Sequence, residues 1–131
     1  MKTKIGWISL AILAILLSAC GGGASGNNQS AHDQQVSAGQ TVYTESCAEC
    51  HGANLEGVDA PALTADNLSK RFQTAQSMFS YISSSMPLSN PGSLSKDQYL
   101  QAEAYILSQT GQLPADQALT TNNLSNISIS Q

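Results

Sequence analysis

The strongest constraint on how this chain of 131 residues can fold is the motif Cys47-Ala48-Glu49-Cys50-His51. Two cysteines separated by two residues and followed at once by a histidine are the pattern of covalent attachment of a c-type haem. Each thiol adds across one vinyl group of the porphyrin, and this brings His51 under the ring, where its Nε2 can bind the iron. The motif predicts one covalently bound haem c with His51 as an axial ligand.

Three other uses of the two cysteines remain open at this point. A disulfide between Cys47 and Cys50 suits an oxidising compartment, but it would close a very small loop. A thioredoxin-like redox pair needs a βαβ setting, and the sequence shows no strand pattern. A zinc site needs further ligands, and the other histidine, His32, is remote in sequence.

The N-terminal segment has the composition of an export signal. Lys2 and Lys4 precede an apolar run over residues 5–17, which is shorter than the roughly 20 residues of a membrane-spanning helix. The run closes on Leu-Ser-Ala-Cys, which resembles the lipobox of bacterial lipoproteins and implies a diacylglycerol thioether on Cys20. The alternative is an ordinary secretory signal in which Cys20 is incidental.

Composition divides the chain into four parts. We expect a signal peptide over 1–19, the lipidated cysteine and a flexible linker over 20–36, a folded domain over 37–113, and a disordered polar tail over 114–131. His32 falls in the linker, where we expect its side chain to be exposed to solvent.

The folded part is predicted to be all-α, with three to four short helices and loops wrapped around the haem. A capping box over residues 37–40 predicts a helix that runs into Cys47. Gly39 in its first turn indicates close approach of another backbone. Residues 53–67 have no periodicity and are expected to form a loop.

Two further helices follow in the sequence. Apolar residues at spacings of four and three from Leu68 to Ile82 predict one continuous helix. A capping box over residues 95–98 predicts the start of the last helix, which Gly111 and Pro114 should end.

Two methionines outside the signal segment are candidates for the sixth iron ligand. Met78 falls within the apolar stripe of a helix, where a methionine is more often part of the core. Met86 lies in an irregular segment directly before Pro87, and a loop can carry a ligand over the distal face. We predict that Met86 binds the iron, since Met/His ligation suits electron transfer. The alternative is a five-coordinate iron that binds small gases.

Charge and composition exclude several classes of protein. After residue 20, three basic side chains stand against nine carboxylates, a formal net charge of −6, so no basic face for nucleic acid is available. Neither paired carboxylates nor an activated nucleophile indicates an active site, and we predict that the chain is not an enzyme. Six aromatic residues after residue 20 are few, which fits a core completed by a porphyrin.

Residues 37 to about 113 resemble the small bacterial class I c-type cytochromes. The matching parts are Gly39, Val42 and Tyr43 in the first helix, residues 47–52 at the attachment site, residues 60–63 in the next loop, Met86-Pro87 in the ligand loop and residues 99–107 in the last helix.

The resemblance implies roles for several residues. The carbonyl of Pro61 is expected to accept a hydrogen bond from the proximal His51 and thereby tune it as a ligand. Gly39, with Tyr43 and Tyr105, is expected to form the crossing of the first and last helices. Ala102 departs from the family pattern, in which a larger aliphatic residue is common.

The function implied is that of a monomeric, membrane-tethered electron carrier of a respiratory chain, on the periplasmic or outer face of a bacterial membrane. Its redox partners would be a dehydrogenase, a quinol-oxidising complex or a terminal oxidase. Residues 86–107 also resemble haem domains associated with quinoprotein dehydrogenases. The alternative is therefore a dedicated cytochrome subunit of such an enzyme.

Overall fold

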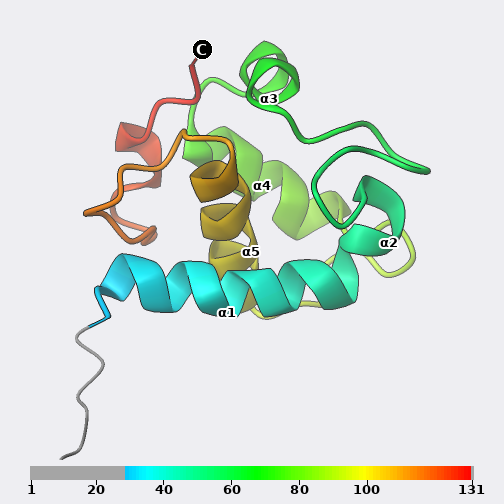
Figure 1. Cartoon of the computed structure of the whole chain (residues 1–131), viewed down its shortest axis with the longest axis horizontal. Helices are drawn as coiled ribbons and strands as arrows, with labels where there is room; N and C mark the ends of the chain where they lie inside the picture. Colours follow the sequence, from blue (N-terminus) through cyan, green and yellow to red (C-terminus); the bar gives the residue numbers. More distant parts are fainter. Residues whose placement is uncertain (1–28, 131) are drawn as a thin grey trace, which may run out of the picture.

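The computed structural model describes residues 29–130, and within them the chain is helical, with no strand. None of the helices in this part has the length and apolarity that crossing a membrane requires. The all-α class is confirmed, with five α-helices where three to four were expected. In chain order these are α1 (Ala31–Ser46), α2 (Ala48–His51), α3 (Ala65–Arg71), α4 (Ala75–Ser85) and α5 (Lys96–Gln109), followed by the 3-10 turn η1 (Leu124–Asn126) (Figure 1).

Helices α1 and α5 cross at the centre of the molecule (Figure 1). A Cβ atom built on Gly39 would overlap the carbonyl oxygen of Gln101 and lie 2.9 Å from the Cβ of Tyr105. Beside this contact the rings of Tyr43 and Tyr105 pack with their centroids 5.3 Å apart. The close approach predicted at Gly39 is confirmed.

Helix α5 begins and ends as its sequence predicts. The Ser95 side chain accepts a hydrogen bond from the backbone N–H of Gln98, and the Gln98 side chain accepts one from the N–H of Ser95 at 2.9 Å. At the other end Thr110 is the C-cap, and Gly111 follows with a φ of 73°, the left-handed conformation that ends a helix.

Helix α1 begins earlier than predicted. Its capping box is formed by Ser30 and Asp33, not by residues 37–40. The prediction of a flexible linker is therefore wrong for residues 31–36, which form the first turns of the helix. His32 lies on its inner face and is 7% exposed, so the expectation of a solvent-exposed side chain is also wrong.

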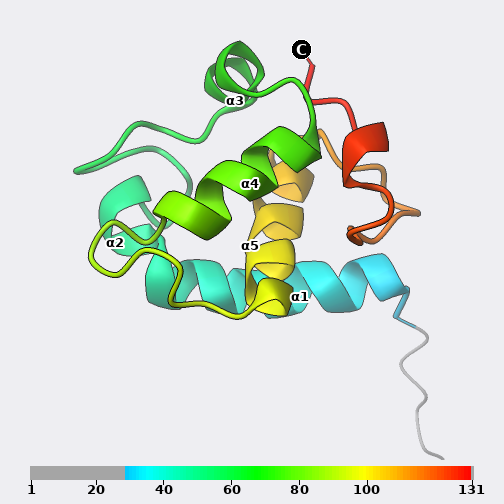
Figure 2. The same ribbon diagram turned by 180° about the vertical axis from the view of Figure 1, so that it is seen from behind.

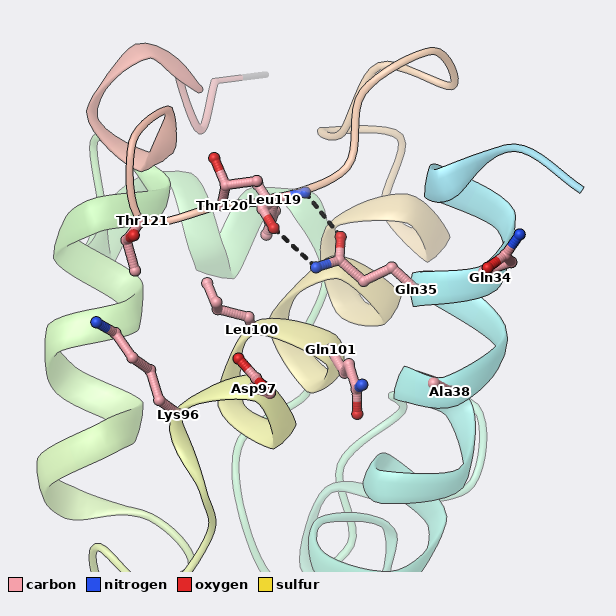
Figure 3. Close-up of a pocket in the computed structure, with 10 residues that line it drawn as sticks. All are labelled: Gln34, Gln35, Ala38, Lys96, Asp97, Leu100, Gln101, Leu119, Thr120 and Thr121. Carbon is pink, nitrogen blue, oxygen red and sulfur yellow. Dashed lines mark hydrogen bonds between the residues drawn. The ribbon is translucent and has the colours of Figure 1, made fainter.

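A contact with the C-terminal segment accounts for the early start of α1. Gln35 Nε2 donates to the carbonyl of Leu119 at 2.8 Å, and the N–H of Leu119 donates to Gln35 Oε1 at 2.7 Å (Figure 3). The side chain amide thus pairs with a backbone far away in sequence, and a polar stretch becomes part of the fold.

The expected tail of residues 114–131 is ordered as far as residue 130, and the prediction of disorder there is wrong. Leu119, Leu124, Ile127 and Ile129 are between 1% and 6% exposed and belong to the core. Their spacings of five, three and two residues follow no helical or strand period, so the sequence does not mark them as core residues.

The prediction of one continuous helix from Leu68 to Ile82 is wrong, because α3 and α4 are separate helices. The C-terminal segment contacts the chain between them. Phe72 is extended, with φ −127° and ψ 137°, and Thr74 caps α4 by accepting a hydrogen bond from the N–H of Ser77. The extended chain between the helices pairs with the C-terminal segment, because the N–H of Ile129 donates to the carbonyl of Gln73 at 2.9 Å. Helix α3 also begins inside the predicted loop of residues 53–67.

The two ends of α1 have different surroundings (Figures 1 and 2). The C-terminal segment lies over the N-terminal half of α1, where a cavity of about 640 Å³ opens between α1, α5 and this segment (Figure 3). Helix α2, the loop after it and the segment between α4 and α5 lie together at the C-terminal end of α1. The predicted haem residues are therefore found at the end opposite the cavity.

Candidate haem-attachment site

Helix α2 is a single turn that follows α1 almost without a break. The N–H of His51 donates to the carbonyl of Cys47 at 2.9 Å, so the motif is closed into an α-helical turn. Residues three and four apart share one face of such a turn. The side chains of Cys47, Cys50 and His51 are therefore presented together, as attachment of one porphyrin edge requires.

Both cysteines are free thiols in the structure, Cys47 half-buried and Cys50 exposed. Burial, with a smaller effect of the neighbouring Cys50, raises the pKa of Cys47 to about 11. The thiols of Cys47 and Cys50 would hold the porphyrin, each by addition of its sulfur and hydrogen across one vinyl group.

The loop after α2 folds back on the end of the helix. The carbonyl of Cys50 accepts hydrogen bonds from three successive backbone amides, those of residues 58–60, each at 3.0 Å. The carbonyl of His51 accepts from Gly57 at 2.7 Å. A Cβ on Gly57 would lie 2.6 Å from the backbone nitrogen of Ala62, so only glycine fits at this reversal.

This fold of the loop brings the carbonyl of Pro61 to the ring of His51. His51 Nδ1 lies 2.9 Å from Pro61 O, the hydrogen bond that the family resemblance implies. The carbonyl can only accept, so it places the imidazole proton on Nδ1 and leaves the lone pair of Nε2 for a metal.

Tyr43 ties the same site to α1. Its Oη donates a hydrogen bond of 2.7 Å to the carbonyl of Gly52, the residue directly after His51. Burial is the main cause that raises the pKa of Tyr43, and the hydroxyl therefore stays protonated as a donor. Sequence reasoning assigned Tyr43 to the helix crossing alone and missed this contact.

The two methionines differ as predicted in their surroundings. Met78 is 1% exposed and lies in the core. Met86 is half-buried and caps the C-terminal end of α4, and both views place the segment that follows it beside α2 (Figures 1 and 2). The carbonyl of Met86 accepts a hydrogen bond of 2.6 Å from Tyr99 Oη.

The residues present at this end fit a haem. The donor set combines two thiols, an imidazole whose Nδ1 is already engaged, and a thioether on the neighbouring segment. Several apolar side chains remain only partly buried against the core, among them Leu63, Phe79 and Ile82, and the core therefore still has apolar surface that a porphyrin could cover. In residues 29–130 no three His, Cys, Asp or Glu side chains are grouped so as to hold a metal ion.

Two further observations concern Glu103, which the sequence did not single out, and Cys20, which the structure does not describe. Glu103 of α5 is 0% exposed, and neither of its carboxylate oxygens has a hydrogen-bond partner. Burial raises the pKa of Glu103 to about 9. Cys20, the predicted lipidation site, lies outside the described residues.

Residues 34–106 match the family model described as "Cytochrome C oxidase, cbb3-type, subunit III". The chain is 35% identical over 68 residues to cytochrome c-551 of Bacillus subtilis (strain 168), a match that covers 48% of this chain and 61% of that protein. The chain thus spans less than two thirds of the length of this relative.

Comparison with solved structures gives two further matches. A chain in the crystal structure of the sulfane dehydrogenase SoxCD from Paracoccus pantotrophus has a TM-score of 0.62 and 26% identity, covering 71% of this chain and 52% of that one. Cytochrome CL from the marine methylotrophic bacterium Methylophaga aminisulfidivorans MPT has a TM-score of 0.45 and 21% identity, covering 76% and 72%.

The family model covers more than half of the chain and includes the whole Cys47–His51 motif. With its two thiols and its histidine arranged on one helical turn, the chain belongs to the family of cytochrome c oxidase, cbb3-type, subunit III, and is a c-type cytochrome with covalently bound haem c.

Proposed function

We propose that this protein is a monohaem electron carrier in which Cys47 and Cys50 hold the haem, and His51 and Met86 are its axial ligands. The observation that carries the proposal is the His51 Nδ1 to Pro61 carbonyl hydrogen bond of 2.9 Å, on a turn that also presents both thiols. When bound, the haem supplies a one-electron iron couple.

Residues of the chain would determine the reduction potential of the iron and how little its ligands rearrange on electron transfer. The Pro61 carbonyl orients the His51 ring and increases its strength as a donor. A thioether from Met86 raises the reduction potential relative to stronger donors. With His51 and Met86 both held by the fold, the iron would keep the same ligands in both oxidation states, and electron transfer would need little rearrangement.

The test of this site compares the wild-type protein with Met86→Ala. We expect a haem stain that survives denaturing electrophoresis in both proteins, because both keep the two cysteines. Met86→Ala should lose the methionine-ligated spectrum and show a lower reduction potential, with Met78→Leu as the control that keeps both. Absence of covalent haem would sink the proposal, and an unchanged spectrum in Met86→Ala would instead favour a five-coordinate, gas-binding iron.

We also propose that the protein is exported and anchored by a lipid on Cys20, on the periplasmic or outer face of a bacterial membrane. Since α1 begins at Ala31, ten residues lie between the anchor and the first helix. Fully extended, they reach about 35 Å, so the domain stays within that distance of the membrane surface. The Cys20→Ser variant should no longer partition into detergent, and its mass should lack the diacylglycerol group. Partition that persists in this variant would contradict the anchor.

The partners proposed are a dehydrogenase, a quinol-oxidising complex or a terminal oxidase. A dedicated subunit of a dehydrogenase is the second candidate, favoured by the TM-score of 0.62 with a chain of a dehydrogenase structure. Size exclusion of a native extract followed by a haem stain distinguishes the two, because a free carrier elutes at the size of the monomer.

The acidic chain is expected to dock on a basic surface of its partner, with association rates that fall as the salt concentration increases.

A further inference from the structure

Tyr99 lies in the first turn of α5 and is fixed there on several sides. Its ring is 4% exposed, and its backbone N–H donates to the carbonyl of the N-cap Ser95 at 3.0 Å. From this position its Oη donates to the carbonyl of Met86 at 2.6 Å. The N–H of Leu94 lies 3.5 Å from the same oxygen, so the hydroxyl stands between the two ends of the segment from Met86 to Leu94.

That segment has few other attachments. All six residues from Leu88 to Ser93 are exposed, and Leu88 is 70% exposed. The backbone of Met86 makes two further hydrogen bonds, from its N–H to the carbonyl of Ile82 at 3.0 Å and from the N–H of Gly92 to its own carbonyl at 3.3 Å. The bond from Tyr99 is the shortest of the three, and it alone connects Met86 to α5.

We infer that Tyr99 is a positioning residue for the distal ligand: its Oη–H holds the Met86 carbonyl and thereby keeps the Met86 side chain in place to bind the iron. The inference rests on the proposed function, because it requires Met86 to be the sixth ligand. Helix α5 is the fixed support, since it packs against both α1 and α4. The segment from Met86 to Leu94 carries the ligand, whereas α5 fixes where the ligand lies.

The measured quantity is the ease with which an added base displaces the methionine. In ferric wild-type protein, imidazole competes with Met86 for the sixth position, and the weak far-red band of methionine-ligated haem disappears as it binds. A hydrogen bond is worth about 0.5–1.5 kcal/mol, and 1.4 kcal/mol is tenfold in an equilibrium constant. Tyr99→Phe should therefore lower the dissociation constant of imidazole by about two- to twelvefold.

Tyr81→Phe is the matched control. Tyr81 lies on α4, where its ring packs 5.6 Å from Phe72 and the Arg71 guanidinium lies 4.3 Å from its centroid. The control loses the same hydroxyl oxygen, and its imidazole affinity should equal that of the wild type. A role of Tyr99 in overall stability alone would leave imidazole affinity unchanged while the unfolding midpoint fell.

The outcomes distinguish failure of Met86 ligation from failure of the inference about Tyr99. If the wild type has no far-red band, Met86 ligation itself fails. If the band is present and Tyr99→Phe binds imidazole as the wild type does, Met86 ligation stands and the inference about Tyr99 is wrong. Should Tyr99→Phe not fold, Tyr99→Leu is the second variant, because it keeps an apolar side chain and also lacks the donor to the Met86 carbonyl. Unchanged imidazole affinity in Tyr99→Leu would equally overturn the inference.

Discussion

The hydroxyl of Tyr43 donates a hydrogen bond of 2.7 Å to the carbonyl of Gly52, and so links the long helix α1 to the residue after the proximal histidine. Gly52 is buried, and the loop that carries Pro61 begins there. The distal side has a similar link, in which Tyr99 holds the carbonyl of Met86. In the proposed site, each of the two iron ligands thus has a tyrosine of a central helix hydrogen-bonded to its own carbonyl or to that of the next residue.

Removal of the first link should weaken the fold. In Tyr43→Phe the buried carbonyl of Gly52 loses this hydrogen bond, and we expect the free energy of unfolding to fall by about 1–3 kcal/mol. Urea denaturation of the holoprotein measures the change. The control is Tyr81→Phe, and a loss no larger than in that control would contradict the importance of the Tyr43 contact.

Any side chain at position 39 should separate the two central helices. The Cβ of Gly39→Ala would meet the Gln101 carbonyl, a rigid backbone group, and we expect a loss of about 1–3 kcal/mol despite the better helix propensity of alanine. Ser37→Ala, on the exposed face of the same helix, is the control and should be neutral or slightly stabilising. Equal stability of the two variants would show that α1 and α5 do not approach as closely as described.

Ionisation of Glu103 should make stability depend on pH. Burial raises the pKa of Glu103 to about 9 in the folded protein, whereas in the unfolded chain the carboxyl has its ordinary pKa of 4.5. Between these values the unfolded state binds fewer protons, so the free energy of unfolding falls as pH rises, by at most about 1.4 kcal/mol per pH unit.

Glu103→Gln removes that titration. The variant should resemble the wild type near pH 5, exceed it in stability at pH 8, and show a smaller dependence on pH in urea denaturation. Glu45→Gln, which changes an exposed carboxyl on α1, should leave the wild-type dependence intact. Parallel pH profiles of Glu103→Gln and the wild type would mean that Glu103 is ionised in the folded protein.

The C-terminal segment should contribute to stability as part of the core. Leu124 is 1% exposed, and truncation of such a side chain leaves a cavity that costs about 2–5 kcal/mol. Leu124→Ala should therefore lower the unfolding midpoint strongly, and the neighbouring exposed Ser125→Ala should not. Two indistinguishable melting curves would restore the earlier expectation of a disordered tail.

Structural features could be predicted from the sequence where all the interacting residues lie within one short segment. The spacing of Cys47, Cys50 and His51 implies a shared helical face in any α-helical turn. The reciprocal cap of Ser95 and Gln98 lies within four residues and could be predicted from them alone. The close approach at Gly39 is a long-range contact that the residues alone predicted correctly. The signal was a glycine inside a helix, where glycine is ordinarily unfavourable.

The sequence by itself thus determined the cofactor, the all-α class and the last helix, and it predicts Cys47 and Cys50 as the attachment residues. Only the tertiary structure decided where α1 begins, where α3 and α4 separate, that residues 114–130 are ordered, and that Tyr99 holds Met86. The reason is the range of the interactions. Gln35 pairs with Leu119 across 84 positions, and hydrogen bonds between such distant residues leave no period or spacing in the sequence.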